Sequence, residues 1–229
     1  MGSGERLIAV VGLAFEARIA AGPGVKVICS GNGKNLAVSL TRAIEEGATG
    51  VMSFGVAGGL SPDLAPGTCI IGAAILYGTD RINRINTHDD WSQSLAQTIP
   101  GAVRGMLFGV PSPVTHPDAK AALYLRSGAI AVDMESHIVG GVAAKYGVPM
   151  AAVRVIADPA ARAIPKSALA AMRPNGTTDI PAMLWSMLRR PRDLPAVLQT
   201  ALDARAARAT LVRGRQLLSP GLGLAFERA

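Results

Sequence analysis

Long apolar runs, cysteines and aromatic residues are all scarce in this sequence, and each shortage excludes a class of protein. Hydrophobic residues make up 49% of the chain, yet no uninterrupted apolar run reaches the roughly 18 residues of a membrane-spanning helix. The only cysteines, Cys29 and Cys69, have apolar, strand-like neighbours, which favours reduced core thiols over a disulfide framework or metal site. Aromatic residues, at 4%, are too few for the stacking platforms that bind single-stranded nucleic acid.

The first residues of the chain bear on its expected location. Its first six residues, MGSGER, have neither the basic-then-apolar order nor the cleavage site of a secretory signal, so we expect a cytoplasmic protein. The histidines at 88, 116 and 137 are scattered without the spacing of metal ligands, and each is interpreted as a polar or packing residue. A length of 229 residues suits one sizeable α/β core.

Positive charge is present in excess but is unevenly distributed. Twenty-three Lys and Arg against 16 Asp and Glu give a net charge of +7, which is compatible with nucleic acid, anionic lipid or an anionic substrate as a partner. From Arg189 to the end, eight arginines face three acidic residues, which accounts for +5 of that total. The basic character therefore belongs mainly to the tail, and we expect no nucleic acid partner.

Apolar segments typical of strands alternate with segments of helical periodicity. The first strand is apolar throughout, as expected for a sheet that is covered on both faces. The predicted strands span residues 7–13, 25–29, 50–56, 68–77, 103–110, 129–132 and 150–157, and the predicted helices span residues 32–46 or 35–46, 118–126 and 135–146. This order predicts a three-layer α/β domain.

The composition changes after about Pro159, where Ala, Arg, Pro and Leu become dominant and a long helix is predicted over 194–218. We therefore divide the chain into a catalytic domain, residues 1–179, and a basic amphipathic helical extension, residues 180–229. The apolar and arginine-rich pattern of Pro181–Leu218 is compatible with peripheral binding to an anionic membrane. The alternative is that this segment packs against the body or a partner subunit.

Three carboxylates each follow a predicted strand. Glu16 comes after the first strand, Glu135 stands at a strand-to-helix junction, and Asp158 ends the last strand. The glycine-rich segment Gly55–Gly59 also ends a strand, and there the backbone can approach a ligand closely. It matches neither a dinucleotide fingerprint nor a Walker A loop. Taken alone, the acids are equally compatible with helix caps and surface pairs, and the glycines with a tight turn.

Taken together, these segments carry a family resemblance. The chain resembles the purine nucleoside phosphorylase and methylthioadenosine/S-adenosylhomocysteine nucleosidase superfamily over roughly residues 7–160. The matching segments are Gly12–Glu16, Gly55–Leu60, Ala131–Glu135 and Arg154–Asp158. The basic tail further resembles the hopanoid-biosynthesis-associated branch, whose proposed substrate is adenosylhopane. The resemblance implies a three-layer α/β/α domain with a central mixed sheet. It also implies a homodimer and no cofactor, apart from phosphate as co-substrate in a phosphorylase.

The resemblance implies a role for each carboxylate. Asp158 would protonate or hydrogen-bond N7, so that adenine leaves as a neutral base. Glu135 would hold the ribose hydroxyls, and Met134 would lie against the sugar, although ordinary core packing also explains a methionine there. Glu16 would orient and deprotonate the attacking water.

Backbone groups around Ala57 and Gly58 would border the base and the ribose, and the loop Ser112–Thr115 would cover adenine. The aromatic stacking residue that the nucleosidases usually carry in this loop is replaced here by Ser, Pro or Val. Base recognition would then depend on backbone hydrogen bonds and on aliphatic walls, which include Val114.

Hydrolysis and phosphorolysis differ in the nucleophile. The phosphorylase relatives bind phosphate with an Arg and a Ser or Thr at positions that correspond here to Ser53 and Val56. Arg18, one turn into a helix, is either a replacement cation or a solvated surface residue. We therefore expect hydrolysis of a 5′-substituted adenosine, either a small molecule or a lipid-linked nucleoside. The alternatives are phosphorolysis, a non-catalytic nucleoside-binding module, and a basic adaptor for lipid or nucleic acid.

Overall fold

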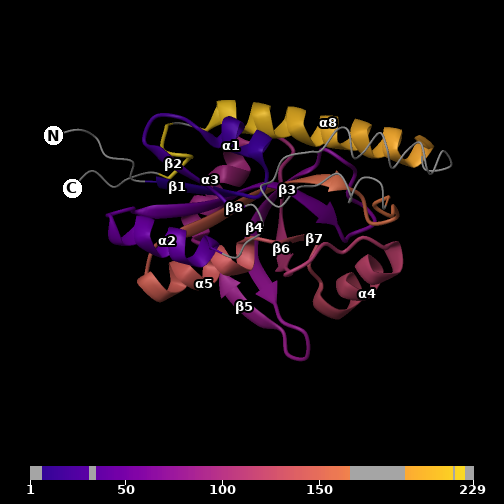
Figure 1. The fold of residues 1–229 in the computed structure, drawn as a ribbon, viewed down its shortest axis with the longest axis horizontal. Coiled ribbons are helices and arrows are strands. Elements are labelled where there is room, and N and C mark those ends of the chain that lie inside the picture. Colours follow the sequence, from indigo (N-terminus) through magenta and orange to yellow (C-terminus); the bar gives the residue numbers. More distant parts are fainter. Residues whose placement is uncertain (1–6, 31–34, 166–193, 219, 225–229) are drawn as a thin grey trace.

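The computed structural model describes residues 7–30, 35–165, 194–218 and 220–224 (Figure 1). The elements in chain order are β1 (Leu7–Val11), α1 (Ala14–Ala20), β2 (Val25–Cys29), α2 (Leu36–Glu45), β3 (Gly50–Gly59), β4 (Cys69–Tyr77), β5 (Asn83–Asn86), α3 (Asp89–Thr98), β6 (Val103–Gly109), α4 (Pro117–Ser127), β7 (Ala131–Asp133), α5 (Ser136–Tyr146), β8 (Met150–Asp158) and α8 (Leu194–Leu217). The predicted alternation of strands and helices is confirmed, while α1, α3 and β5 were not among the predicted elements. The expected domain boundary at 179/180 and the apolar segment 181–188 lie outside the described residues.

The sheet is mixed, as predicted, and part of it closes on itself. Strand β3 is parallel to β8, which is antiparallel to β4, and β4 is parallel to β6. The short strand β7 completes the ring, because it pairs in parallel with β6 and antiparallel with β3. Strands β1 and β2 extend the sheet from β3, and β5 extends it from β4. The ring brings the ends of β3, β7 and β8 together.

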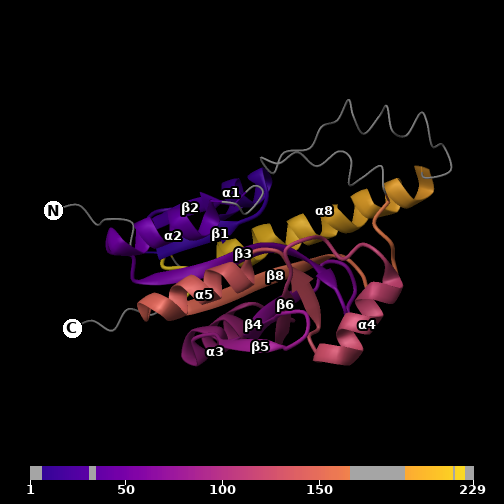
Figure 2. The ribbon, with the colours of Figure 1, turned by 60° about the horizontal axis from the view of Figure 1, so that its bottom comes forward.

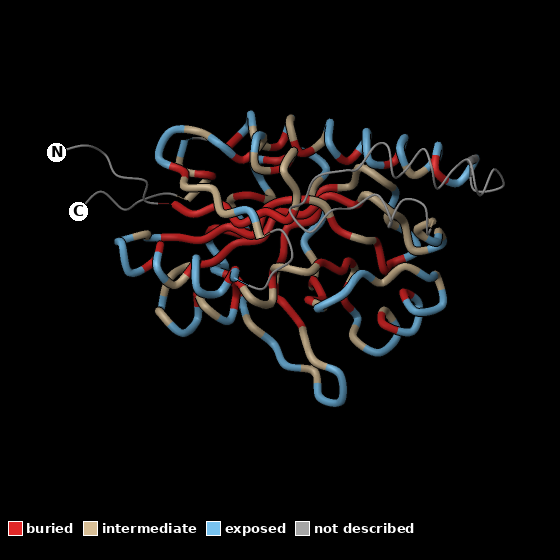
Figure 3. Tube along the Cα trace, viewed as in Figure 1, coloured by how far each residue is buried: buried red, intermediate tan, exposed pale blue. Residues whose placement is uncertain are grey.

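The side chains of β1 show how the two faces of the sheet are covered. Leu7, Ala9 and Val11 belong to one buried cluster, which includes residues of α1, α3 and α8. Ile8 and Val10 belong to another, which includes residues of α2 and α5. This alternation is the period of two that a strand imposes on its side chains. Figures 1 and 2 show the helices on the two sides, and Figure 3 shows the buried residues concentrated along the strands.

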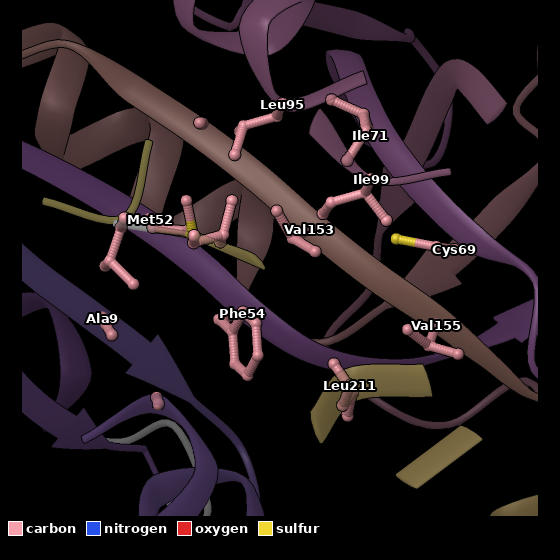
Figure 4. Packing of buried hydrophobic residues seen from close by; sticks show 14 of the residues in the cluster. Ala9, Met52, Phe54, Cys69, Ile71, Leu95, Ile99, Val153, Val155 and Leu211 are labelled. Atoms are coloured by element: carbon pink, nitrogen blue, oxygen red, sulfur yellow. The ribbon is translucent and has the colours of Figure 1, made fainter. Parts of the chain in front are cut away.

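Helix α8 covers one face of the sheet. Its Leu211 is 1% exposed and belongs to the same cluster as Phe54 of β3 and Val155 of β8 (Figure 4). After the helix, the backbone oxygen of Leu222 accepts a hydrogen bond of 3.0 Å from the Trp91 indole. The tail was expected either to bind a membrane or to pack against the body. For the inner face of α8, packing against the body is the correct interpretation.

The two cysteines differ from each other. Cys69 is buried, and burial raises the pKa of its thiol to about 12. Cys29 is exposed, so the prediction that both thiols lie in the core is wrong for this residue. The reason is its position at the end of β2, which is an edge strand. Within the described part of the chain, no helix is both long enough and apolar enough to cross a membrane.

Candidate active site

One cavity of about 310 Å³ lies where β1, β3, β7 and β8 end. The three carboxylates with predicted roles, Glu16, Glu135 and Asp158, all line this cavity. The other residues with predicted site roles also line it, namely Ala57, Gly58, Val114 and Met134. Residues that are up to 142 positions apart, from 16 to 158, therefore meet at one place.

Glycines provide the space that the carboxylates occupy. At three positions an added Cβ would lie closer to a carboxylate oxygen than ordinary van der Waals contact allows. The distances are 2.5 Å from Glu16 at Gly55, 2.7 Å from Glu135 at Gly12 and 3.1 Å from Asp158 at Gly58. Contacts below 3 Å are not tolerated by ordinary side chains, so Gly12 and Gly55 are required for the observed placement. The glycines in these motifs are therefore explained by the space that the carboxylates need.

Glu16 is 1% exposed and accepts three backbone hydrogen bonds. Its donors are the N–H groups of Gly12 at 2.9 Å, Leu13 at 2.8 Å and Val56 at 2.7 Å. Burial raises the pKa of Glu16 to about 7, although Arg154 acts in the opposite direction. A carboxylate with this pKa exchanges a proton readily near neutral pH, which is what a general base requires.

Arg154 supplies the cation of the site, and sequence reasoning gave it no role. Its guanidinium, 1% exposed, donates hydrogen bonds to Ser53 Oγ at 2.5 Å and to Glu135 Oε2 at 3.2 Å. Its Nε lies 3.1 Å from Asp133 Oδ2 as an ion pair, without the alignment of a hydrogen bond. The available signal was one charged residue inside an otherwise apolar strand. Arg18, the cation considered from sequence, is exposed.

Asp133 is a further acidic residue that the roles predicted from sequence did not include. Its Oδ1 accepts hydrogen bonds from the backbone N–H groups of Glu135 at 3.1 Å and Ser136 at 2.8 Å, at the start of α5. It therefore fixes the junction that carries Glu135. Burial raises the pKa of Glu135, Arg154 opposes that shift, and Asp133 adds to it.

Asp158 lies at another part of the cavity and has its own cation. Lys120 of α4 places Nζ 2.6 Å from Asp158 Oδ2. Burial raises the pKa of Asp158, and Lys120 acts against this shift. No role for Lys120 was predicted, because a lysine in a helix is normally interpreted as a solvated residue.

The remaining walls of the cavity are largely apolar. The loop that was expected to cover adenine contributes Pro113 and Val114. A backbone hydrogen bond of 2.9 Å from Ile164 to Thr115 ties this loop to the segment after β8. Helix α8 contributes Thr200 and Ala204, so the C-terminal region takes part in the cavity.

None of the three histidines, all of them in described parts of the chain, lines the cavity. His88 precedes α3 and accepts a hydrogen bond from Trp91 N at 3.3 Å, and His116 lies 3.4 Å from Asp118. His137 stacks on Tyr77, with ring centroids 6.5 Å apart. These contacts are those of capping and packing residues. Among the described residues, no group of three or more His, Cys, Asp or Glu is placed to hold a metal ion.

A mixed sheet flanked by helices, with acids from separate strand ends around one cavity, defines an α/β enzyme. The chain belongs to the phosphorylase superfamily, whose sequence profile matches residues 10–180. No curated protein sequence matches it.

Solved structures share the fold. A putative methylthioadenosine nucleosidase from Weissella paramesenteroides is 20% identical with a TM-score of 0.60, and the match covers 92% of this chain and 97% of that one. Futalosine hydrolase from Helicobacter pylori is 18% identical with a TM-score of 0.59, over 79% and 98% of the two chains. A methylthioadenosine/S-adenosylhomocysteine nucleosidase from Colwellia psychrerythraea, in complex with adenine, is 14% identical with a TM-score of 0.63, over 93% and 94%.

Proposed function

We propose that this enzyme hydrolyses the N-glycosidic bond of a 5′-substituted adenosine, and that adenosylhopane is its substrate. The observation that supports this most directly is the convergence of Glu16, Glu135 and Asp158 on one cavity, each in a different electrostatic setting. Carboxyl groups in different environments can act as acid or as base, because burial and neighbouring charges give them different pKa values. The structural relatives include methylthioadenosine nucleosidases, in agreement with this chemistry.

The leaving group is the first difficulty of the reaction, because adenine departs poorly as an anion. Asp158 is the acid at this position: it is largely buried, and burial raises its pKa. In the proposed step, the proton of the Asp158 carboxyl passes to N7 while the bond between the ribose and the base breaks. The bonding electrons leave with the base, so adenine departs as a neutral molecule.

The ribose then carries positive charge, which the opposite part of the cavity accommodates. Glu135 is held by Arg154 at its carboxylate and by the Asp133 carboxylate at its backbone N–H, and it is placed to accept hydrogen bonds from the ribose hydroxyls. A fixed carboxylate near the ring also stabilises the developing oxocarbenium charge. Met134 supplies an adjacent, polarisable wall.

The surroundings of Glu16 favour water over phosphate as the nucleophile. Three backbone N–H groups suited to an anion are already occupied by the Glu16 carboxylate. Arg154 is paired with Asp133 and Glu135, and Ser53 is fully buried with its hydroxyl bonded to Arg154. In the described part of the cavity, a phosphate dianion would therefore meet carboxylates and no unpaired cation. Water, by contrast, needs only a base, and Glu16 takes its proton.

The nature of the 5′ substituent is suggested by the cavity walls. Ile164 and the α8 residues Thr200 and Ala204 extend the lining beyond the carboxylates. Ala204 is exposed, so the cavity opens to solvent beside α8. An apolar 5′ group that runs toward this helix fits such walls, which supports a lipid-linked nucleoside as the substrate.

Helix α8 also supports peripheral contact with an anionic membrane. On its outer side Leu198 is 61% and Leu202 50% exposed, and the neighbouring Arg205 and Arg208 are exposed as well. Exposed leucines beside arginines are the combination that amphipathic helices use at lipid surfaces. Because this helix also lines the cavity, membrane contact would place the opening near a lipid substrate.

Adenine release is the assay that tests the proposed function. Purified enzyme is incubated with methylthioadenosine, S-adenosylhomocysteine or adenosylhopane, with and without phosphate, and the products are separated by chromatography. We expect adenine and the free sugar in both conditions, with the highest kcat/KM for adenosylhopane. A ribose 1-phosphate product that forms only when phosphate is added would overturn the hydrolase assignment, and failure to release adenine from any nucleoside would overturn the function.

A further inference from the structure

We infer that Lys120 is a positioning residue for the leaving-group acid: by occupying Oδ2 of Asp158, it confines the transferable proton to Oδ1. The inference rests on the proposed function, because it concerns the acid of that reaction. Asp158 and Lys120 are 38 positions apart, on β8 and α4, and nothing in their local sequence connects them.

The ammonium group of Lys120 is completely enclosed. Its side chain is 0% exposed, and Nζ lies 2.6 Å from Asp158 Oδ2, 2.9 Å from the Pro159 oxygen and 3.1 Å from the Arg162 oxygen. An ammonium has three hydrogens to donate, and each has an acceptor here. A buried lysine is costly unless it is paired in this way. The three bonds fix both the Asp158 side chain and the segment that follows it.

The same contact decides which carboxyl oxygen carries the proton. An ammonium only donates, so a hydrogen on Oδ2 would point at another donor and lose its hydrogen bond. Among the described residues, Asp158 Oδ1 has no hydrogen-bond partner, while the residue lines the cavity. Protonation therefore takes place at Oδ1, the oxygen that is left for the leaving base.

Lys120 also compensates the charge that appears on Asp158 during the reaction. When the proton passes from Oδ1 to N7 and the glycosidic bond breaks, Asp158 becomes a carboxylate in a buried site. An unpaired buried carboxylate is strongly disfavoured, but this one is already bound to an ammonium. Transfer of the proton is thereby made easier without the lysine touching the substrate.

Contributions of opposite sign set the pKa of Asp158. Burial raises its pKa, Lys120 lowers it, and Asp203 of α8 adds a smaller upward shift. Asp203 is itself paired with Arg162, whose backbone oxygen Lys120 binds. The other charged groups that line the cavity are Glu16, Asp133, Glu135 and Arg154.

The decisive variant is Lys120→Met, which removes the charge and keeps an unbranched side chain. Because Asp158 works as an acid, activity falls as pH rises through its pKa. Loss of a cation in direct contact raises such a pKa by about 1–3 units. We therefore expect the alkaline limb of the kcat profile to move upward by about 1–3 pH units, and the plateau value of kcat to fall roughly tenfold, because the carboxyl is no longer held in one orientation.

Two further variants separate charge from structure. Lys145→Met, on the exposed surface of α5, is the matched control and leaves the profile unchanged. Lys120→Arg keeps the positive charge, so its alkaline limb stays near the wild-type position even if kcat falls. If Lys120→Met does not fold, Lys120→Arg becomes the test variant. An alkaline limb that moves upward in Lys120→Arg, although the positive charge is retained, would contradict the inference. A folded Lys120→Met enzyme with an unmoved limb and kcat within about twofold of wild type would overturn it.

A measurement without turnover distinguishes failure of this inference from failure of the proposed function. The Asp158 carboxyl is titrated by carbon-13 NMR in wild type and in Lys120→Met, with its signal assigned through Asp158→Asn. The inference requires a higher pKa of Asp158 in the lysine variant, and an equal pKa overturns it. If the wild type releases no adenine, the proposed function fails, and this titration still decides the role of Lys120.

Discussion

At the scale of single residues, the acid and the base of the proposed reaction are distinguished by their neighbours. Glu16 is buried and accepts three backbone N–H groups, and its pKa is raised to about 7. Asp158 has an ammonium on one oxygen, and its other oxygen has no partner among the described residues. Glu16 lies in the first turn of α1 and Asp158 at the end of β8. Two groups of the same type therefore act in different steps because their neighbours differ.

The raised pKa of Glu16 leads to a pH prediction. A general base works only when it is deprotonated, so the acid limb of the kcat/KM profile should rise with pH up to about 7. At higher pH, kcat/KM should fall again where the acid Asp158 loses its proton. Glu16→Gln cannot accept a proton, and kcat should fall by roughly 10²–10⁴-fold, the usual contribution of such a group. The check is a pH profile of wild-type kcat/KM together with single-point rates for the variant. Near-normal turnover in Glu16→Gln would remove this residue from the role of base.

Asp158→Asn should lower kcat far more than it changes KM, because the proton is needed mainly in the transition state. The expected loss of kcat is roughly 10²–10⁴-fold with an adenine nucleoside. A nitrophenyl riboside, whose leaving group needs no protonation, is the matched control substrate and should lose much less. Steady-state kinetics on the two substrates gives the comparison, and equal losses on both would mean that Asp158 does not act on the leaving group.

The residues of the cavity differ in how far the sequence could predict them. Glu16, Glu135 and Asp158 could be brought together from sequence through the family resemblance of the segments that carry them, whereas their spacing alone left helix caps and surface pairs open. The strand before Glu135, β7, runs antiparallel to β3, so a shared edge of parallel strands does not account for its position. Lys120 could not, because its acceptors come from a distant strand end and loop. Arg154 could be recognised in the sequence as a charged residue inside an apolar strand, β8. Its partners, Ser53 and Glu135, are known only from the three-dimensional structure.

At the scale of secondary-structure elements, local pattern predicted helices better than it predicted their contacts. The bounds of α8 differ by one residue from the predicted helix, because this stretch is rich in good helix formers. The omitted helix α3 carried a usable signal, since Asp89 and Asp90 in its first turn precede Trp91 and Leu95 at helical spacing. The ring of strands closes because β7 pairs with β3 and β6, and β3 is distant from β7 in sequence. The periodicity of a segment does not predict such pairings.

The burial of α8 predicts that it stabilises the body. Leu211→Ala removes a side chain that is 1% exposed within the cluster beneath the helix, and should cost about 2–5 kcal/mol of the free energy of unfolding. Leu202→Ala, on the exposed side of the same helix, is the control and should change it by less than about 0.5 kcal/mol. Urea denaturation followed by circular dichroism measures both. Equal, small effects would show that α8 is not part of the core in solution.

At the scale of the whole molecule, charge and apolar surface coincide on the outer side of α8. The tail from residue 189 onward carries most of the net positive charge, and two leucines of the helix remain exposed beside its arginines. Removing the tail is not a clean test of membrane binding, since truncation near Asp179 would also remove Ala207 and Leu211 from the core. Substitutions on the exposed side of α8 leave that packing intact.

The variant that tests membrane contact is therefore Leu198→Glu combined with Leu202→Glu. Wild type should float with vesicles that contain phosphatidylglycerol and remain unbound to purely zwitterionic vesicles, because arginines attract anionic headgroups while the leucines insert. The double variant replaces two inserting side chains with negative charges, so its bound fraction on anionic vesicles should fall at least about tenfold. Leu125→Glu, at an 84% exposed position on α4, adds a carboxylate away from α8 and should bind as wild type does. If the double variant floats as well as the Leu125 control, α8 does not contact the membrane, and the enzyme must meet a lipid-linked substrate by another surface.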